Sequence, residues 1–298
     1  YNADFIKLIG NTDLLVRSDI KAPINVKNFF GIGNGTFYDK SRPGEFRYYR
    51  TRYNLADASV LLRKTLQSWM NVSYGAIFQY YNLDSAQNRD KFINNFAING
   101  QDPETVAKRK TYLGAVVNLD IDSRNNKVIP SRGANISLSG RTMWGLNKAA
   151  QSNLTRFDAD LGIFISLVEN SKTVFATRFG YGKNIGHYEF FQAQYLGGNT
   201  NLRGFPNNRF AGRSMFFNNS EIRFRIADFK TYLFPGAFGL IVFNDVGRVW
   251  ANEKSSKEWH YGYGAGLYLS PLRRFVIAGY YTRSSEGAFP LVTFGFQF

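Results

Sequence analysis

The residue types that most often carry enzyme chemistry are scarce in this chain. It has no cysteine, which excludes disulfides, thiolate metal sites and cysteine nucleophiles. The two histidines, His187 and His260, are far apart and lack a metal-ligand spacing, so we interpret them as loop or interface residues. No Gly-x-Ser-x-Gly motif occurs, and neither histidine has an evident serine and carboxylate arrangement. We therefore expect no catalytic site, no metal site and no cofactor within these residues.

Two pairs of aspartates are the remaining candidates for acid–base chemistry, Asp158 with Asp160 and Asp120 with Asp122. Residues two apart share one face of a strand, so each pair would sit side by side. Many arginines surround these acids in the sequence, and membership of ion-pair networks explains them more simply than catalysis does.

The most distinctive feature is an arginine followed by a glycine and an aromatic residue, in the sequence Leu202-Arg203-Gly204-Phe205. It lies within YLGGNTNLRGFPNNRFAGR, a glycine-rich and aromatic stretch at residues 195–213. A guanidinium held inside a protein needs charge partners, because an unpaired buried charge is costly.

Alternation of apolar and polar residues identifies the elements that position this motif. Ile222, Phe224 and Ile226 oppose Glu221, Arg223 and Arg225; Phe238, Leu240 and Val242 oppose Phe243 and Asp245; Tyr261, Tyr263 and Ala265 oppose Gly262, Gly264 and Gly266. Each set predicts a strand with one apolar face and one polar or glycine face. Charges inside and apolar groups outside are the inverse of a water-soluble barrel, so the pattern favours a transmembrane β-barrel over a β-sandwich.

The inner face supplies partners for the arginine. Glu221 and Asp245 are expected to point inward from adjacent strands, with Phe243 on the same face. A bidentate arginine–carboxylate pair would fix the loop with a planar geometry that lysine cannot reproduce. We therefore expect Arg203 to lie inside the barrel within hydrogen-bond reach of Asp245, Glu221 or both. The glycine face at 262, 264 and 266 would leave room for that loop.

The last ten residues alternate as well. Val292, Phe294, Phe296 and Phe298 are expected to face lipid, and Thr293, Gly295 and Gln297 the lumen. Fourteen strand-like runs lie near 12–20, 22–32, 44–54, 56–65, 69–82, 110–122, 133–143, 155–168, 172–183, 213–227, 237–250, 259–270, 273–283 and 289–298, and a fifteenth is added if residues 4–9 end another strand. Longer spacers fall at 83–109, 144–153 and 184–212. No domain boundary appears within 1–298.

Composition agrees with a membrane barrel. No run approaches the roughly 20 apolar residues of a membrane-spanning helix, while aromatic residues make up 17% of the chain. The formal net charge is +15, with the cations interleaved along the strands. A basic lumen, or contact with anionic lipid headgroups, explains this spread better than a nucleic-acid surface does.

The motif in its setting resembles the BamA/TamA superfamily of outer-membrane assembly and translocation barrels. The resemblance rests on Leu196-Gly197-Gly198, the motif at 202–205, the strands NNSEIRF and FNDVGRV, and three further strands ending in Phe298. A looser match is the hairpin carrying Asp122, Arg124, Asn125, Pro130 and Gly133. Leu202 stands where the family usually has valine, and Asn125 where it usually has aspartate. The resemblance covers roughly residues 22–298.

The resemblance implies a sixteen-stranded barrel in the outer membrane of a Gram-negative bacterium. Residues 184–212 would form an extracellular loop folded into the lumen, with the motif held against Glu221, Phe243 and Asp245. Phe294, Phe296 and Phe298 would be the terminal sorting signal. The first strand or strands and any periplasmic domain are expected to precede residue 1. The opening residues also resemble members fused to a phosphoesterase or patatin-like domain.

The implied function is insertion, assembly or translocation of other polypeptides through a seam between the first and last strands, without a cofactor. The expected partners are outer-membrane lipids, client polypeptides and periplasmic or complex subunits. The alternative is a passive pore, or a membrane anchor for an upstream enzymatic domain or a partner complex. A client that adds a strand at the seam would distinguish the first function from the second.

Overall fold

The protein is described by a computed structural model that covers residues 1–298 except 43, 151–152, 169–171, 233 and 252–255. Within the described residues, thirteen strands form one antiparallel sheet and two short strands form a separate ribbon. The strands of the sheet are β1 (Asn2–Ile9), β2 (Thr12–Asn28), β3 (Arg50–Gln67), β4 (Met70–Asn82), β5 (Lys110–Asp122), β6 (Gly133–Gly145), β7 (Leu154–Ser166), β8 (Thr173–Gly186), β11 (Ser214–Lys230), β12 (Pro235–Trp250), β13 (His260–Pro271), β14 (Ile277–Ser284) and β15 (Gly287–Phe294). The ribbon consists of β9 (Gln194–Leu196) and β10 (Phe210–Gly212). The expected all-β, antiparallel barrel class is confirmed.

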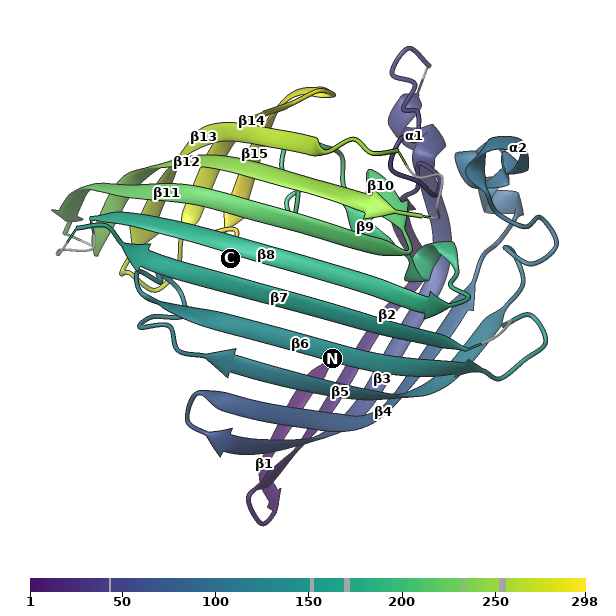
Figure 1. The fold of residues 1–298 in the computed structure, drawn as a ribbon, viewed down its shortest axis with the longest axis horizontal. Helices are drawn as coiled ribbons and strands as arrows, with labels where there is room; N and C mark the ends of the chain where they lie inside the picture. The colour runs from purple at the N-terminus through teal and green to yellow at the C-terminus, as the bar shows by residue number, and fades with distance from the viewer. Residues whose placement is uncertain (43, 151–152, 169–171, 233, 252–255) are drawn as a thin grey trace.

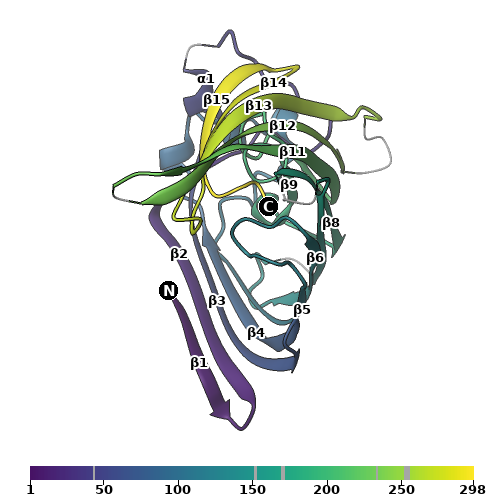
Figure 2. The same cartoon turned by 90° about the vertical axis from the view of Figure 1, so that its left-hand side faces the viewer.

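The sheet curls into a barrel-like wall whose strands follow the order of the chain (Figures 1 and 2). Every neighbouring pair is antiparallel. In the described chain, β1 is paired only with β2, and β15 only with β14. The sheet is therefore not closed by its own two end strands, and the tilted purple and yellow ends stand apart in Figure 2. In particular, β15 does not pair with residues 12–20 of β2.

Two pairs of predicted runs are in fact single long strands. Residues 12–20 and most of 22–32 form β2, which passes Pro23 by a register shift between Lys21 and Asn25. A bulge lets the ladder continue past a proline, which has no backbone N–H to donate. Residues 50–54 join 56–65 in β3, and the residues before them form the short helix α1 (Glu45–Tyr49). The run at 4–9 belongs to β1.

The strand faces follow the predicted alternation. Large apolar side chains with more than a third of their surface exposed recur along the outer face, among them Val60, Tyr74, Phe78, Leu113, Val117, Leu138, Phe157, Ile165, Val242 and Leu267. A belt of exposed apolar groups on every side suits a hydrocarbon environment and not water. No helix among the described residues is long and apolar enough to cross a membrane.

On the inner face, Asp158 and Asp160 make the ion pairs that were expected of them, whereas Asp120 is hydrogen-bonded to a serine. Asp158 accepts a hydrogen bond from Arg156 Nε at 2.8 Å, and Asp160 lies 2.6 Å from Arg178 Nη2. Asp120 accepts from the Ser137 hydroxyl at 2.8 Å, on the neighbouring strand. The contacts of Asp160 and Asp120 join neighbouring strands, while Arg156 and Asp158 both belong to β7.

The hairpin between β5 and β6 is held by its own side chains. Asp122 receives Nε and Nη2 of Arg124, each at 2.9 Å. The Asn125 side chain accepts from the backbone N–H groups of Ser131 and Arg132. Gly133 has φ +103°, and a Cβ there would lie 2.4 Å from the carbonyl oxygen of Ser123. The matching motif therefore shapes a turn.

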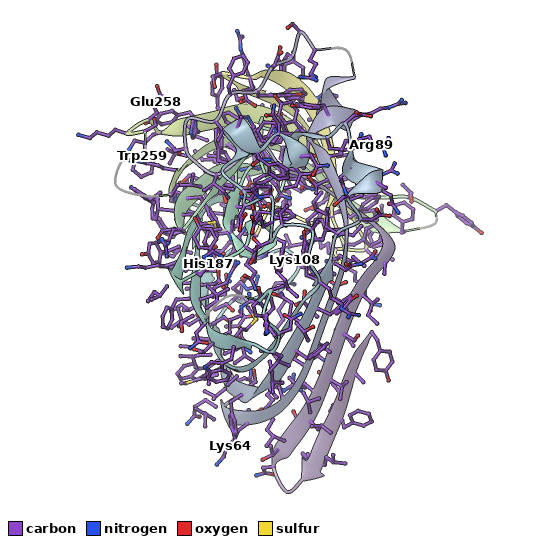
Figure 3. The ribbon with its side chains drawn as sticks, turned by 90° about the vertical axis from the view of Figure 1, so that its right-hand side faces the viewer. Lys64, Arg89, Lys108, His187, Glu258 and Trp259 are labelled. Carbon is purple, nitrogen blue, oxygen red and sulfur yellow. The ribbon has the colours of Figure 1, made fainter. Side chains whose placement is uncertain are left out.

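The two ends of the barrel differ. One, the short-turn end, has connections such as 10–11 and 272–276; the other, the long-loop end, has 29–49, 83–109, 187–213 and 251–259. Figure 3 looks onto the long-loop end, where Arg89, Lys108, His187 and Glu258 mark three of these connections. An aromatic cluster packs these loops against the wall at the long-loop end. It consists of Phe29, Phe30, Tyr38, Tyr49, Tyr53, Tyr81, Phe92, Phe190 and Phe191. α2 (Phe96–Asn99) and the short 3-10 turns Ala86–Asn88, Phe92–Asn94 and Phe190–Gln192 lie within the same loops.

The end of the chain departs from the expected lipid-facing row. Phe294 is 86% exposed and ends β15, after which Gly295 takes φ +108°. Phe296 then lies under the guanidinium of Arg223, with 3.9 Å between Cζ and the ring centroid. The expectation that Phe296 and Phe298 face lipid is wrong, because the glycine turns both inward, where Figure 2 places the C-terminus.

Candidate functional site

The connection between β8 and β11 folds back against the inner wall. Glu189 and Gln192 form a capping box around the turn Phe190–Gln192, and β9 then pairs with β10 from Leu196–Phe210 to Gln194–Gly212. This ribbon presents residues 202–205, which we call the loop tip. The Leu202 N–H donates to the Gly198 carbonyl at 3.1 Å, closing the tight turn from which the tip projects.

Arg203 is fully buried between two carboxylates of the wall. Its Nε and Nη2 donate to Asp245 Oδ2 and Oδ1 at 2.8 and 2.7 Å, and its Nη1 donates to Glu221 Oε2 at 3.1 Å. The backbone N–H of Arg203 also donates to Asp245 Oδ2 at 3.0 Å. Asp245 and Glu221 come from the adjacent strands β12 and β11, and both side chains are fully buried. The bidentate geometry is specific to a guanidinium.

Aromatic rings cover the same guanidinium. Its Cζ lies 3.7 Å from the ring centroid of Phe243 and 5.4 Å from that of Tyr280, within range of cation–π attraction. Burial acts to lower the pKa of Arg203, but the carboxylates of Asp245 and Glu221 outweigh it and raise that pKa above its usual value. Arg203 therefore stays charged, and its charge is neutralised locally.

Glu221 links this pair to a second arginine. Its Oε1 accepts from Arg223 Nε at 2.6 Å, and Arg223 Nη2 donates to the Phe298 carbonyl at 3.0 Å. Through Arg223, the Glu221 carboxylate thus connects the loop tip to the end of the chain. Sequence alternation placed Arg223 on the inner face but gave no sign of this second contact, which depends on the inward turn at Gly295.

Two glycines permit the close approach of tip and wall. Gly204 has φ +87°, and a Cβ there would meet the carbonyl oxygen of Arg283 at 3.0 Å. A Cβ on Gly262 of β13 would lie 1.8 Å from the carbonyl oxygen of Arg203. The Ser284 hydroxyl donates to the Gly204 carbonyl at 2.5 Å. The tip backbone therefore rests directly on β13 and the end of β14.

Replacing Gly262 with alanine is expected to displace the loop tip, because its methyl group would overlap backbone that cannot rotate away. We expect a loss of about 1–3 kcal/mol in the free energy of unfolding, the usual cost of overpacking, and faster proteolysis within 187–213. The matched control is Gly279→Ala on β14, where an added Cβ meets nothing within 4 Å. Equal behaviour of the two variants in urea unfolding and limited proteolysis would contradict the contact.

The apolar residues of the tip anchor it. Leu202 is fully buried and Phe205 is 5% exposed, in a cluster with Leu196, Phe210, Phe217 and Val249. Phe210 also stacks on His260, with ring centroids 3.7 Å apart. His260 is thus an interface residue, as the sequence suggested, whereas His187 lies 3.7 Å from Glu189 with half its side chain exposed.

The site is suited to holding a loop. Its charged groups are paired with one another, and no group of three or more His, Cys, Asp or Glu side chains that could hold a metal ion occurs in the described ranges. Sequence reasoning missed Arg209, a second buried arginine of the same loop, because its partners Thr36 and Glu286 lie 173 and 77 residues away.

Comparisons with known proteins agree with this architecture. The Omp85 superfamily domain matches residues 17–278. Among solved structures, BamA from Haemophilus ducreyi lacking POTRA domains 1–3 is similar at a TM-score of 0.65 and 13% identity, over 95% of this chain and 62% of that one. CdiB from Acinetobacter baumannii is similar at 0.57 and 13% identity, over 96% and 48%, and CdiB from Escherichia coli at 0.54 and 11%, over 95% and 49%. The chain thus spans about half to three fifths of these proteins. A search of curated proteins found no match.

Proposed function

Because this chain belongs to the Omp85 superfamily, whose barrels serve protein assembly and translocation in the outer membrane of Gram-negative bacteria, we propose that it inserts, assembles or translocates other polypeptides there. The observation that carries the proposal is the edge of β15, the last strand of the sheet, which pairs only with β14 in the described chain. Unpaired backbone N–H and C=O groups cost several kcal/mol each in lipid, so such an edge attracts a pairing strand. A client strand would add there by β-augmentation.

The loop tip would keep residues 184–212 folded inside the lumen, in the conformation that supports insertion or translocation of polypeptides. Residues 184–212 would enter from the extracellular side, and Arg203 would hold them against Glu221, Phe243 and Asp245. The short-turn end would then face the periplasm, from which clients arrive. The inward Phe296 and Phe298 would leave β15 with Phe294 as its last exposed aromatic residue, and we retain all three as the proposed sorting signal.

A passive pore is less well supported. The aromatic cluster of the long-loop end and the loop tip occupy the interior with buried side chains, which favours a gated route over an open channel. An anchor for an upstream enzymatic domain or for complex subunits remains the alternative, and the following experiment separates it from the proposal.

A photo-crosslinking amino acid at Val292, which is 65% exposed on β15, is expected to capture client polypeptides in cells that make the full-length protein. The matched control is the same substitution at Val117, which is 54% exposed on the outer face of the interior strand β5. A client strand that pairs with β15 would pass Val292 and not Val117. Equal adducts at the two sites, or none at Val292 during active secretion, would favour the anchor instead.

A further inference from the structure

The segment after β2 crosses the long-loop end and reaches the opposite end of the sheet. We call residues 29–40 the strap. The strap starts directly after β2, whose last residue, Asn28, pairs with Arg50 of β3. It pairs with the ribbon where the Gly33 N–H donates to the Ala211 carbonyl at 2.7 Å. Its far end meets the β14–β15 turn, where the Lys40 ammonium donates to the Glu286 carbonyl.

Asn34 fastens the middle of the strap. Its side chain accepts from the Val249 N–H at 3.0 Å and donates to the Glu258 carbonyl at 2.9 Å, and only 1% of its surface is exposed. His260 Nε2 lies 3.0 Å from the Asn34 carbonyl oxygen. The strap is thus bound to the end of β12 and the start of β13 before it reaches the last hairpin.

Arg209 joins the strap, the lumen loop and the last hairpin at one point. Its Nη1 and Nη2 donate to the hydroxyl and carbonyl oxygens of Thr36 at 2.7 and 2.6 Å, and its Nε donates to Glu286 Oε1 at 2.5 Å. Rings of the strap and the ribbon cover the guanidinium, with Phe30 at 5.0 Å and Phe210 at 4.6 Å from Cζ. Arg209 is 4% exposed.

From these contacts we propose that the strap fixes the distance between the end of β2 and the β14–β15 turn at the long-loop end, with Arg209 as its positioning residue. Whatever strands stand between β1 and β15, this side of the wall then widens only from the short-turn end. There, β1 and β15 have no comparable tie between them in the described residues. For the proposed function, on which this use of the strap rests, client strands would enter from the short-turn end and the outer end would stay shut.

The buried ion pair is suited to positioning and not to adding stability. Burial lowers the pKa of Arg209 and raises that of Glu286, and each partner only partly offsets that effect for the other. Such a pair costs desolvation, but removing one partner leaves the other charge buried. The pair is therefore satisfied only while the strap holds its observed position, and a displaced strap would leave a buried charge without its partner.

Distances between spin labels in the full-length protein test the strap directly. These 298 residues contain no cysteine, so within them each introduced cysteine is a unique labelling site. Val26 and Ser285 report on the long-loop end, while Ile6 and Val292 report on the short-turn end; all four are exposed. We expect a narrow distance distribution for Val26–Ser285 and a broad one for Ile6–Val292. Arg209→Met and the milder Glu286→Gln should broaden the first and leave the second unchanged.

The control is Arg273→Met, which breaks an exposed pair with Asp228 (56% and 49% exposed) at the short-turn end. It should leave both distributions as they are. A broad Val26–Ser285 distribution in the unmodified protein, or a narrow one in folded Glu286→Gln, would overturn the strap. Because no client is present, this outcome is independent of the crosslinking result at Val292.

Discussion

Replacement of Arg203 by methionine is expected to lower the free energy of unfolding by roughly 3–5 kcal/mol, the usual cost of removing one partner of a buried ion pair. The two carboxylates are not equally affected. Glu221 keeps its contact with Arg223 at 2.6 Å, whereas in the described part of the chain the side-chain partners of Asp245 all belong to Arg203. Asp245 would therefore be left charged and fully buried, holding only the backbone N–H of residue 203.

The double variant Arg203→Met/Asp245→Asn separates charge from packing. If the loss comes from the orphaned carboxylate, the neutral amide should recover a large part of it. Arg203→Lys should fall between the wild type and Arg203→Met, because an ammonium cannot make the two parallel contacts. Urea unfolding in vesicles gives the stability, and protease cleavage within 187–213 shows whether the loop is released. Wild-type stability of Arg203→Met would contradict a dry, ion-paired site.

Lysine at Leu138 is expected to cost about 2–4 kcal/mol, while lysine at the adjacent Ser137 should cost less than about 1 kcal/mol. Leu138 lies midway along β6 and is 41% exposed on the outer face. Ser137 points inward and donates to Asp120 at 2.8 Å, so a cation there gains a nearby carboxylate. The lysine at residue 138 costs more because the outer face of β6 meets lipid, whereas the inner face does not.

Leu138 and Ser137 do not differ in the class of their solvent exposure. Both residues are exposed, so in a water-soluble sheet either lysine would be tolerated. Folding into vesicles, followed by heat-dependent mobility on a gel, measures the fraction folded for each variant. Equal penalties would mean that the outer face of β6 does not meet hydrocarbon, since a one-residue change of register exchanges the two faces.

The faces of the wall and the partners of Arg203 could be predicted from sequence because both depend on a period of two. Once β11 and β12 were placed, Glu221 and Asp245 had to point inward from neighbouring strands. The glycine face of β13 likewise indicated a close approach, which Gly262 makes with the backbone of Arg203.

The remaining features depend on contacts between distant segments, for which alternation carries no information. The runs at 12–20 and 22–32 were predicted as two strands, but the bulge between Lys21 and Asn25 joins them in β2. The alternation at 292–298 continued beyond Gly295, where a positive φ turns the chain inward. The strap has no periodic pattern, and Arg209 differs from a surface arginine only through residues that folding brings to it.

Strand direction limits what can complete the wall. Thirteen strands in an unbroken antiparallel order make twelve reversals, so β1 and β15 run the same way. Direct pairing of the two would form a parallel junction, and an antiparallel closure requires an odd number of strands between them. One added strand would give fourteen and three would give sixteen, both of the even parity usual for bacterial outer-membrane barrels. A hairpin inserted whole would leave one parallel junction, whereas a single strand would leave none.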